Sequence, residues 1–143
     1  MNADLSVAPE IAQLATSLAP ARGGARTDGR VAGDLAELAA APQRWWDQVR
    51  FDPDGPVRVT LPGVRGAWLL VLPPGGAADC ACLQATALAG EAVEERSGTV
   101  PGRPLRPGRV LVHGSRAPHR VRAAGPGYSV TLHATSAAVV LPD

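Results

Sequence analysis

The sequence predicts an all-β domain (a sandwich, jelly roll or closed barrel) preceded by two short helices. The 143 residues include 16 Gly and 14 Pro, which favours many turns over a helical bundle. From Val57 onward, short apolar or alternating segments recur about every ten residues with turns between them, the pattern of a small all-β domain. The expected strands are 57–61, 67–72, 83–88, 91–95, 109–113, 119–123 and 129–134.

Helical spacing dominates the first third of the chain, and an Arg/Gly-rich connector, residues 21–30, separates the two expected helices. The residues expected on one face are Ile11, Leu14 and Leu18 in the first helix and Val31, Leu35 and Leu38 in the second. Two short helices cannot bury these faces alone, so we expect them to dock on a larger body. We divide the chain into a helical extension, residues 1–43, and a β-domain, residues 44–143.

All 14 basic residues are arginine, which excludes a Schiff-base lysine enzyme and a Walker A phosphate loop. Residues 96–142 hold seven of these arginines and no acid. That block could attract an anion, or its arginines could cover the solvated faces of strands. Aromatic residues are not interleaved with the arginines, so we expect no nucleic-acid partner.

Only two cysteines are present, which is not a disulfide framework. No apolar run approaches the roughly 20 residues of a membrane span. The first residues carry acids early and lack the features of a signal peptide. We therefore expect a cytoplasmic protein with no membrane partner.

The segment 105–122 carries the most information about function. A Pro-Gly turn launches a β-branched strand, a small-residue turn follows, and Pro118 precedes His119 at the start of an alternating strand. This arrangement resembles the second conserved motif of the cupin superfamily, which supplies a metal-ligating histidine. The resemblance implies a double-stranded β-helix, or jelly-roll barrel, with the ring of His119 inside.

Over residues 44–136 the chain resembles the cysteine-dioxygenase-like cupins, particularly their small bacterial members. Arg44-Trp45-Trp46 is similar to their aromatic opening segment, and 67–73 is similar to their first long strand. Ala89-Gly90-Glu91 is similar to their Gly-Glu hairpin, and 129–136 is similar to their closing strand.

The family's metal set is a His-x-His pair plus a third histidine, and the third is matched here by His119. Cys80 and Cys82 stand in the region of the missing pair. Their i, i+2 spacing places both side chains on one face of a strand, so they could replace the two histidines. Two thiolates and one imidazole suit zinc better than an oxygen-activating ferrous centre. The alternative is that both cysteines are small buried fillers of an alanine-rich core.

The closing strand carries the candidate catalytic residues. The family pattern places a serine and a histidine there, matched by Thr131 and His133, while the family's tyrosine is absent. Thr135 shares the face of these two residues by period two. The resemblance assigns substrate binding to the region of Gln48, with Arg50 and Arg58 as substitutes for the family's arginine and Thr135 nearby.

Three further arginines, Arg116, Arg120 and Arg122, are candidates for holding an anion near the site. His113 precedes Gly114, and we expect it at a turn or rim.

Three functional hypotheses follow. On the ligand count we favour a cupin that has lost the His-x-His pair and binds a small ligand, an anion or a thiol, with no metal or a weakly bound one. The alternative is an iron-dependent thiol dioxygenase that converts a small thiol to a sulfinate. A metal-independent enzyme built around His119 and His133 stays open. We also expect a homodimer, since few acids and no lysine guard the strand edges.

Overall fold

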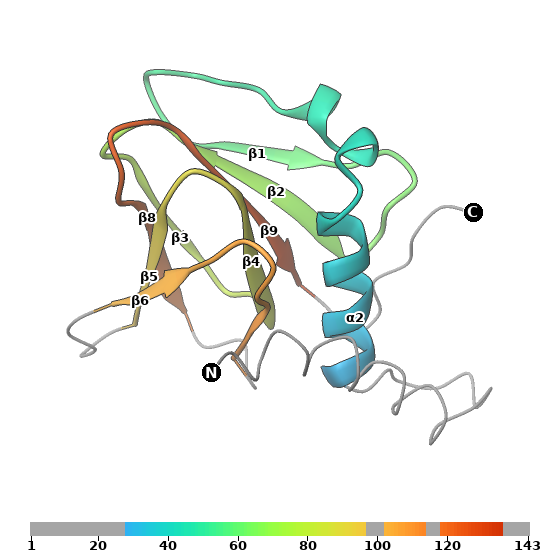
Figure 1. Cartoon of the computed structure of the whole chain (residues 1–143). Coiled ribbons are helices and arrows are strands. Elements are labelled where there is room, and N and C mark those ends of the chain that lie inside the picture. The colour runs from blue at the N-terminus through green and yellow to red at the C-terminus, as the bar shows by residue number, and fades with distance from the viewer. Residues whose placement is uncertain (1–27, 97–101, 114–117, 136–143) are drawn as a thin grey trace.

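The computed structural model describes residues 28–96, 102–113 and 118–135. Two antiparallel sheets face each other, and one helix covers the outer side of the larger sheet (Figure 1). In spatial order the larger sheet holds β1 (Val57–Thr60), β2 (Ala67–Leu72), β9 (Ser129–Ala134), β4 (Gln84–Ala89) and β7 (Leu111–Val112). The smaller sheet holds β3 (Ala77–Cys80), β8 (His119–Ala123), β5 (Ala92–Arg96) and β6 (Arg103–Leu105).

The central strands β2 and β9 of the larger sheet are buried on both faces. On β2, Leu69 and Val71 join one apolar cluster, whereas Leu70 and Leu72 join the other. The first cluster lies under the helix, and the second lies between the two sheets. A strand that packs on both faces needs apolar residues at every position, which explains the continuous run in 67–72.

The helix α2 (Asp28–Ala39) docks through the face predicted from its spacing. Val31, Leu35 and Leu38 are all buried and belong to the cluster that contains Leu69 and Val71. Two 3-10 turns, η1 (Pro42–Arg44) and η2 (Trp46–Gln48), follow, and the buried Trp45 between them donates its ring N–H to the Leu38 carbonyl. None of the described helices is both long and apolar enough to cross a membrane.

Sequence patterns predicted most strands correctly. β2, β8 and β9 have the predicted bounds, while β1, β4 and β5 differ by a residue at one or both ends. β3 and β6 were missed, because alanine-rich and proline-containing segments have weak strand propensity and are held here by pairing with β8 and β5. The strand predicted over 109–113 is regular only at Leu111–Val112. The predicted first helix lies outside the described residues.

Gly90 forms the tight connection between β4 and β5. Its φ is +74°, and a Cβ there would lie 2.1 Å from the carbonyl oxygen of Tyr128. Only glycine permits this close approach, which brings β5 against the start of β9.

Replacing Leu35 with alanine tests the docking of α2. Leu35 is fully buried between the helix and the sheet, so Leu35→Ala should lower the free energy of unfolding by about 2–5 kcal/mol. Urea denaturation measures the change, and Glu37→Ala on the exposed side of the same helix is the matched control. A loss below about 1 kcal/mol would contradict the packing of this helix.

Candidate metal centre

Every cysteine and histidine of the chain lies in one buried cluster. The chain has two cysteines and three histidines, and the five side chains come from β3, the β3–β4 connection, the end of β7, β8 and β9. Both cysteines are free, and the donor atoms form two overlapping groups within 4.8 Å. The first group is Cys80, Cys82 and His133, and the second is Cys82, His113 and His119.

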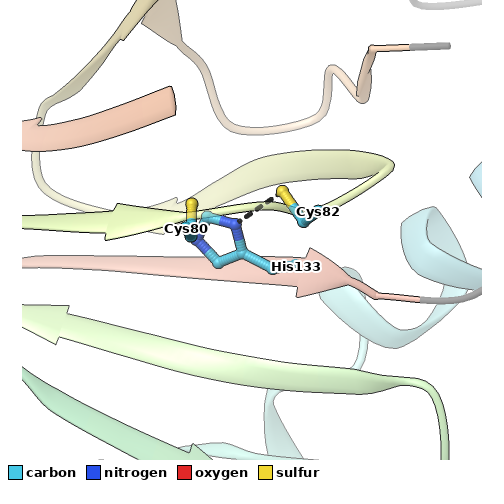
Figure 2. A group of neighbouring side chains, drawn as sticks. All are labelled: Cys80, Cys82 and His133. Carbon is cyan, nitrogen blue, oxygen red and sulfur yellow. Dashed lines mark hydrogen bonds between the residues drawn. The ribbon is translucent and has the colours of Figure 1, made fainter. Parts of the chain in front are cut away.

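The two sulfur atoms meet the ring nitrogens at contact distance. Cys80 ends β3 opposite His119 of β8, and Cys82 lies two residues further along the chain. The Nε2 atom of His119 is 3.1 Å from Cys80 Sγ and 3.4 Å from Cys82 Sγ. The Nδ1 atom of His133 is 3.3 Å from Cys82 Sγ, with Cys80 beside the ring (Figure 2).

Neighbouring groups fix the orientation of His133. Its Nε2 atom lies 2.7 Å from Thr131 Oγ1, which lies 3.5 Å from the Leu70 carbonyl and donates to it. When Nδ1 carries the lone pair, Nε2–H therefore donates to Thr131. The ring also stacks on Trp68 at 4.5 Å, and Trp68 carries the Arg58 guanidinium at 4.2 Å. The ring is thereby held with Nδ1 toward the sulfur atoms.

A carboxylate closes the other side of the cluster. Glu94 of β5 has a fully buried side chain, and its Oε2 contacts His113 Nε2 and lies 3.5 Å from His119 Nε2. Its Oε1 lies 3.1 Å from the Arg103 guanidinium. The rings of His113 and His119 stack at 4.4 Å.

At neutral pH the two cysteine side chains together carry one thiol proton. The hydrogen bond with Cys82 lowers the pKa of Cys80 against the opposing effect of burial, and His119 and His133 lower it further. The same contact with Cys80, together with burial and the charge of Glu94, raises the pKa of Cys82. Cys80 is therefore the thiolate and Cys82 the proton donor.

Two further groups, His133 and Glu94, have the protonation states of metal ligands. Burial lowers the pKa of His133 more than Cys80 raises it, so the ring is neutral at pH 7. Burial raises the pKa of Glu94, but the hydrogen bond and charge of His113 and the contact with Arg103 outweigh it and the net shift is downward. Thiolates, neutral imidazoles and carboxylates are the forms that bind metal ions.

The donor set fits a zinc ion. Zinc–sulfur bonds of about 2.3 Å and zinc–nitrogen bonds of about 2.0–2.1 Å give a tetrahedral sulfur–nitrogen edge of roughly 3.5 Å. The three observed sulfur–nitrogen distances, from 3.1 to 3.4 Å, are within a few tenths of an ångström of that edge. Cys80, Cys82, His119 and His133 would hold the ion, which would link the two sheets.

The predicted substrate residues lie apart from the cluster. Gln48, Arg50 and Arg58 line one surface cavity of about 590 Å³, next to Phe51 and β1. Arg58 connects this cavity to the cluster, because its guanidinium lies over Trp68, which stacks on His133. Thr135 lies past the end of β9, where its backbone N–H donates to the Gly66 carbonyl.

The arginines proposed as an anion site lie at the surface beside the cluster, where Arg120 lines a cavity of about 450 Å³ together with His119. Arg120 pairs with Asp79, Arg122 pairs with Glu95, and both pairs are exposed. Arg116 lies outside the described residues.

Three residues in or beside the cluster were not predicted from the sequence as part of the site. His113 was expected at a turn or rim, which is wrong, since its side chain is only 1% exposed and stacks on His119. Glu94 was not singled out, although it alternates with the buried Ala92 along β5. Trp68 was treated only as part of a strand. The period-two alternation on β5 was the one signal available for Glu94.

Comparisons with known proteins identify the fold. No protein-family model and no curated protein matches the chain. A cupin superfamily protein from Desulfitobacterium hafniense has a TM-score of 0.50 at 17% identity, over 70% of this chain and 89% of that protein.

Two other solved structures are similar. A protein with a double-stranded β-helix domain from Klebsiella pneumoniae has a TM-score of 0.49 at 19% identity, over 68% of this chain and 92% of its own. A complex of SigE with the anti-sigma ChrR from Rhodobacter sphaeroides gives 0.47 at 20% identity, over 87% of this chain and 75% of the matched one.

At these identities the likeness shows the fold alone. The chain has the cupin fold, two facing antiparallel sheets with a helix on the N-terminal side, as predicted. The fold says nothing of the chemistry at the buried cluster.

The ultraviolet absorbance of thiolate in the metal-free protein tests the opposite pKa shifts of Cys80 and Cys82. Cys80 should stay ionised as pH falls well below the ordinary thiol pKa of 9.0, while Cys82 should ionise only above it. Cys80 thus contributes stability that is lost as pH falls through its lowered pKa. Cys82 contributes stability that is lost as pH rises through its raised pKa.

An ultraviolet titration from acid to pH 9.0 should therefore show the absorbance of one thiolate, which appears well below 9.0. Cys82→Ala removes the hydrogen-bond donor and should move the acid step upward toward 9.0. Joint ionisation of both thiols near 9.0 in the unsubstituted protein would contradict the coupling.

Proposed function

We propose that this protein is a metal-binding cupin whose buried centre holds a thiophilic divalent ion, best matched by zinc. The ligands are Cys80, Cys82, His119 and His133. The observation that carries the proposal is the convergence of all five cysteine and histidine side chains of the chain on one buried cluster. This proposal replaces the metal-free alternative favoured on the ligand count.

Burial supports binding rather than simple filling of the core. Cys80 is 7% exposed, Cys82 and His133 are 0% exposed, and His119 is 4% exposed. A buried thiolate costs free energy unless a positive charge offsets it, and a divalent ion supplies that charge. The Thr131 contact with His133 is the kind of outer-shell bond that orients a metal-ligating histidine.

Four protein donors on one ion form a closed site, which is typical of structural zinc. Its ligands come from β3 and β8 of one sheet, β9 of the other and the chain between β3 and β4. Such an ion would stabilise the pairing of the sheets, and it would be released on unfolding.

The finer prediction, an iron-dependent thiol dioxygenase, is the alternative proposal. It requires a metal with open positions for a thiol and dioxygen, which a closed set with two thiolates does not favour. Iron in the purified protein, with oxygen uptake on adding cysteine or 3-mercaptopropionate, would support the oxygenase. Zinc without oxygen uptake supports the closed site.

Metal analysis of the full-length protein, purified under reducing conditions, tests the centre. We expect at least one zinc ion per chain. Cys80→Ser and His133→Ala should each lose more than the roughly 10–100-fold in affinity that removal of an outer-shell partner costs.

The matched control is Ser129→Ala on β9. Ser129 is buried, and its hydroxyl has no hydrogen-bond partner among the described residues, so the variant should fold and keep its zinc. Protein that folds but binds neither zinc nor cobalt would overturn the metal centre.

We also infer a small-ligand site in the cavity lined by Gln48, Arg50 and Arg58, three of the four residues predicted to bind substrate. A carboxylate-bearing ligand such as 3-mercaptopropionate fits two guanidinium groups. Because a hydrogen bond to a charged group contributes about 1.5–3 kcal/mol, Arg50→Gln should weaken calorimetric binding roughly tenfold or more. The exposed Arg65, outside the cavity, gives the control Arg65→Gln, and equal binding by both variants would contradict this site.

A further inference from the structure

The two carboxylate oxygens of Glu94 face opposite ways: one contacts arginines outside the cluster, and the other contacts histidines inside it. Oε1 lies 3.1 Å from Arg103 Nη2 and 3.8 Å from Arg96 Nε. Oε2 faces inward, in contact with His113 Nε2 and 3.5 Å from His119 Nε2. A metal-bound carboxylate is held in this way, with one oxygen on the ion and the other on an outer partner.

The two stacked histidines present their Nε2 atoms to the same carboxylate oxygen. Their rings lie 4.4 Å apart with an interplanar angle of 20°, and both side chains are at most 1% exposed. Two imidazole rings arranged in this way can each donate a ring-nitrogen lone pair to one ion. Nothing in the proposed four-ligand site uses His113 or Glu94.

A sulfur atom completes this second set of donors. Cys82 Sγ lies 3.4 Å from His119 Nε2, and the donor atoms of Cys82, His113 and His119 all lie within 4.8 Å of one another. The set therefore has one sulfur, two nitrogens and one oxygen, each from a buried side chain. These are the donor types that zinc accepts.

We propose that the cluster holds two divalent ions bridged by the Cys82 thiolate. This inference rests on the proposed function, because the first ion is the one described above. The second ion is held by Cys82, His113, His119 and Glu94. His119 lies between the two sets, since its Nε2 is 3.1 Å from Cys80 Sγ and 3.5 Å from Glu94 Oε2.

The shared position of His119 has a chemical consequence. With one ion bound, His119 completes the closed four-ligand site. With two bound, His119 moves to the second ion and the first keeps Cys80, Cys82 and His133. A fourth position is then open to an external ligand, as in catalytic rather than structural zinc sites.

Metal titration of the full-length apoprotein tests the second ion. Cobalt(II) is the probe, because thiolate ligation gives a charge-transfer band and a bridging thiolate couples the two spins. We expect two ions per chain, with a magnetic moment lower than that of two isolated ions. Glu94→Gln and His113→Ala should each bind one ion and keep the charge-transfer band.

Glu95→Gln is the matched control, since Glu95 is the next residue on β5 and pairs with Arg122 at the surface. It should bind two ions like the unsubstituted protein. Circular dichroism checks that each variant is folded.

The outcomes separate the two proposals. One ion per chain in the unsubstituted protein, unchanged by Glu94→Gln, overturns the bridged pair and leaves the first site intact. Two ions without spin coupling overturn the Cys82 bridge. No bound ion, or binding that is insensitive to Cys80→Ser, overturns the proposed function itself.

Discussion

Five donor side chains buried in a small aliphatic interior are the constraint on which the structure depends. The cluster between the sheets is otherwise built from residues such as Leu70, Leu72 and Ala85. A polar group in such surroundings costs free energy unless it has a partner. Four of the five donors find that partner in one another, and His113 finds it in Glu94. The two sheets must therefore keep the spacing that brings β8 and β9 within reach of the sulfur atoms. The core is therefore specified by polar contacts as much as by apolar packing.

Strand patterns in the sequence revealed most of the fold, and the exceptions have a physical cause. β2 and β9 carry apolar or alternating runs, and their predicted bounds match the structure. β3 consists of Ala77–Cys80, with two alanines and an aspartate, and only its pairing with β8 makes it a strand. Local propensity cannot show a strand that depends on its neighbour. The same limit hid β6, which contains Pro104.

Some residues of the site could be predicted from the sequence, and others could not, for similar reasons. Cys80 and Cys82 were found by their i, i+2 spacing, and His133 by the resemblance of its strand to the closing strand of the cysteine-dioxygenase-like cupins. His113 could not be placed, because β7 has two residues and the direction of a side chain past its end depends on the pairing with β4. Glu94 lies among neighbouring acids that read as a solvated face. Only the three-dimensional pairing of β5 with β8 turns it inward.

In this chain without lysine, arginines neutralise the buried carboxylate of Glu94. The buried carboxylate lies next to the acid-free stretch of the chain, and both cations at its outer oxygen are arginines, Arg96 and Arg103. A guanidinium can hold one oxygen through a planar N–H group while much of the side chain stays in water, and the side chain of Arg103 is 45% exposed.

The exposed pairs of Arg120 and Arg122 contribute little to stability by comparison, since solvent screens them. The two arginines that matter most are therefore those that neutralise the buried acid from outside. They leave its inner oxygen free to face the histidines, which is the condition for a carboxylate to act as a ligand inside this barrel.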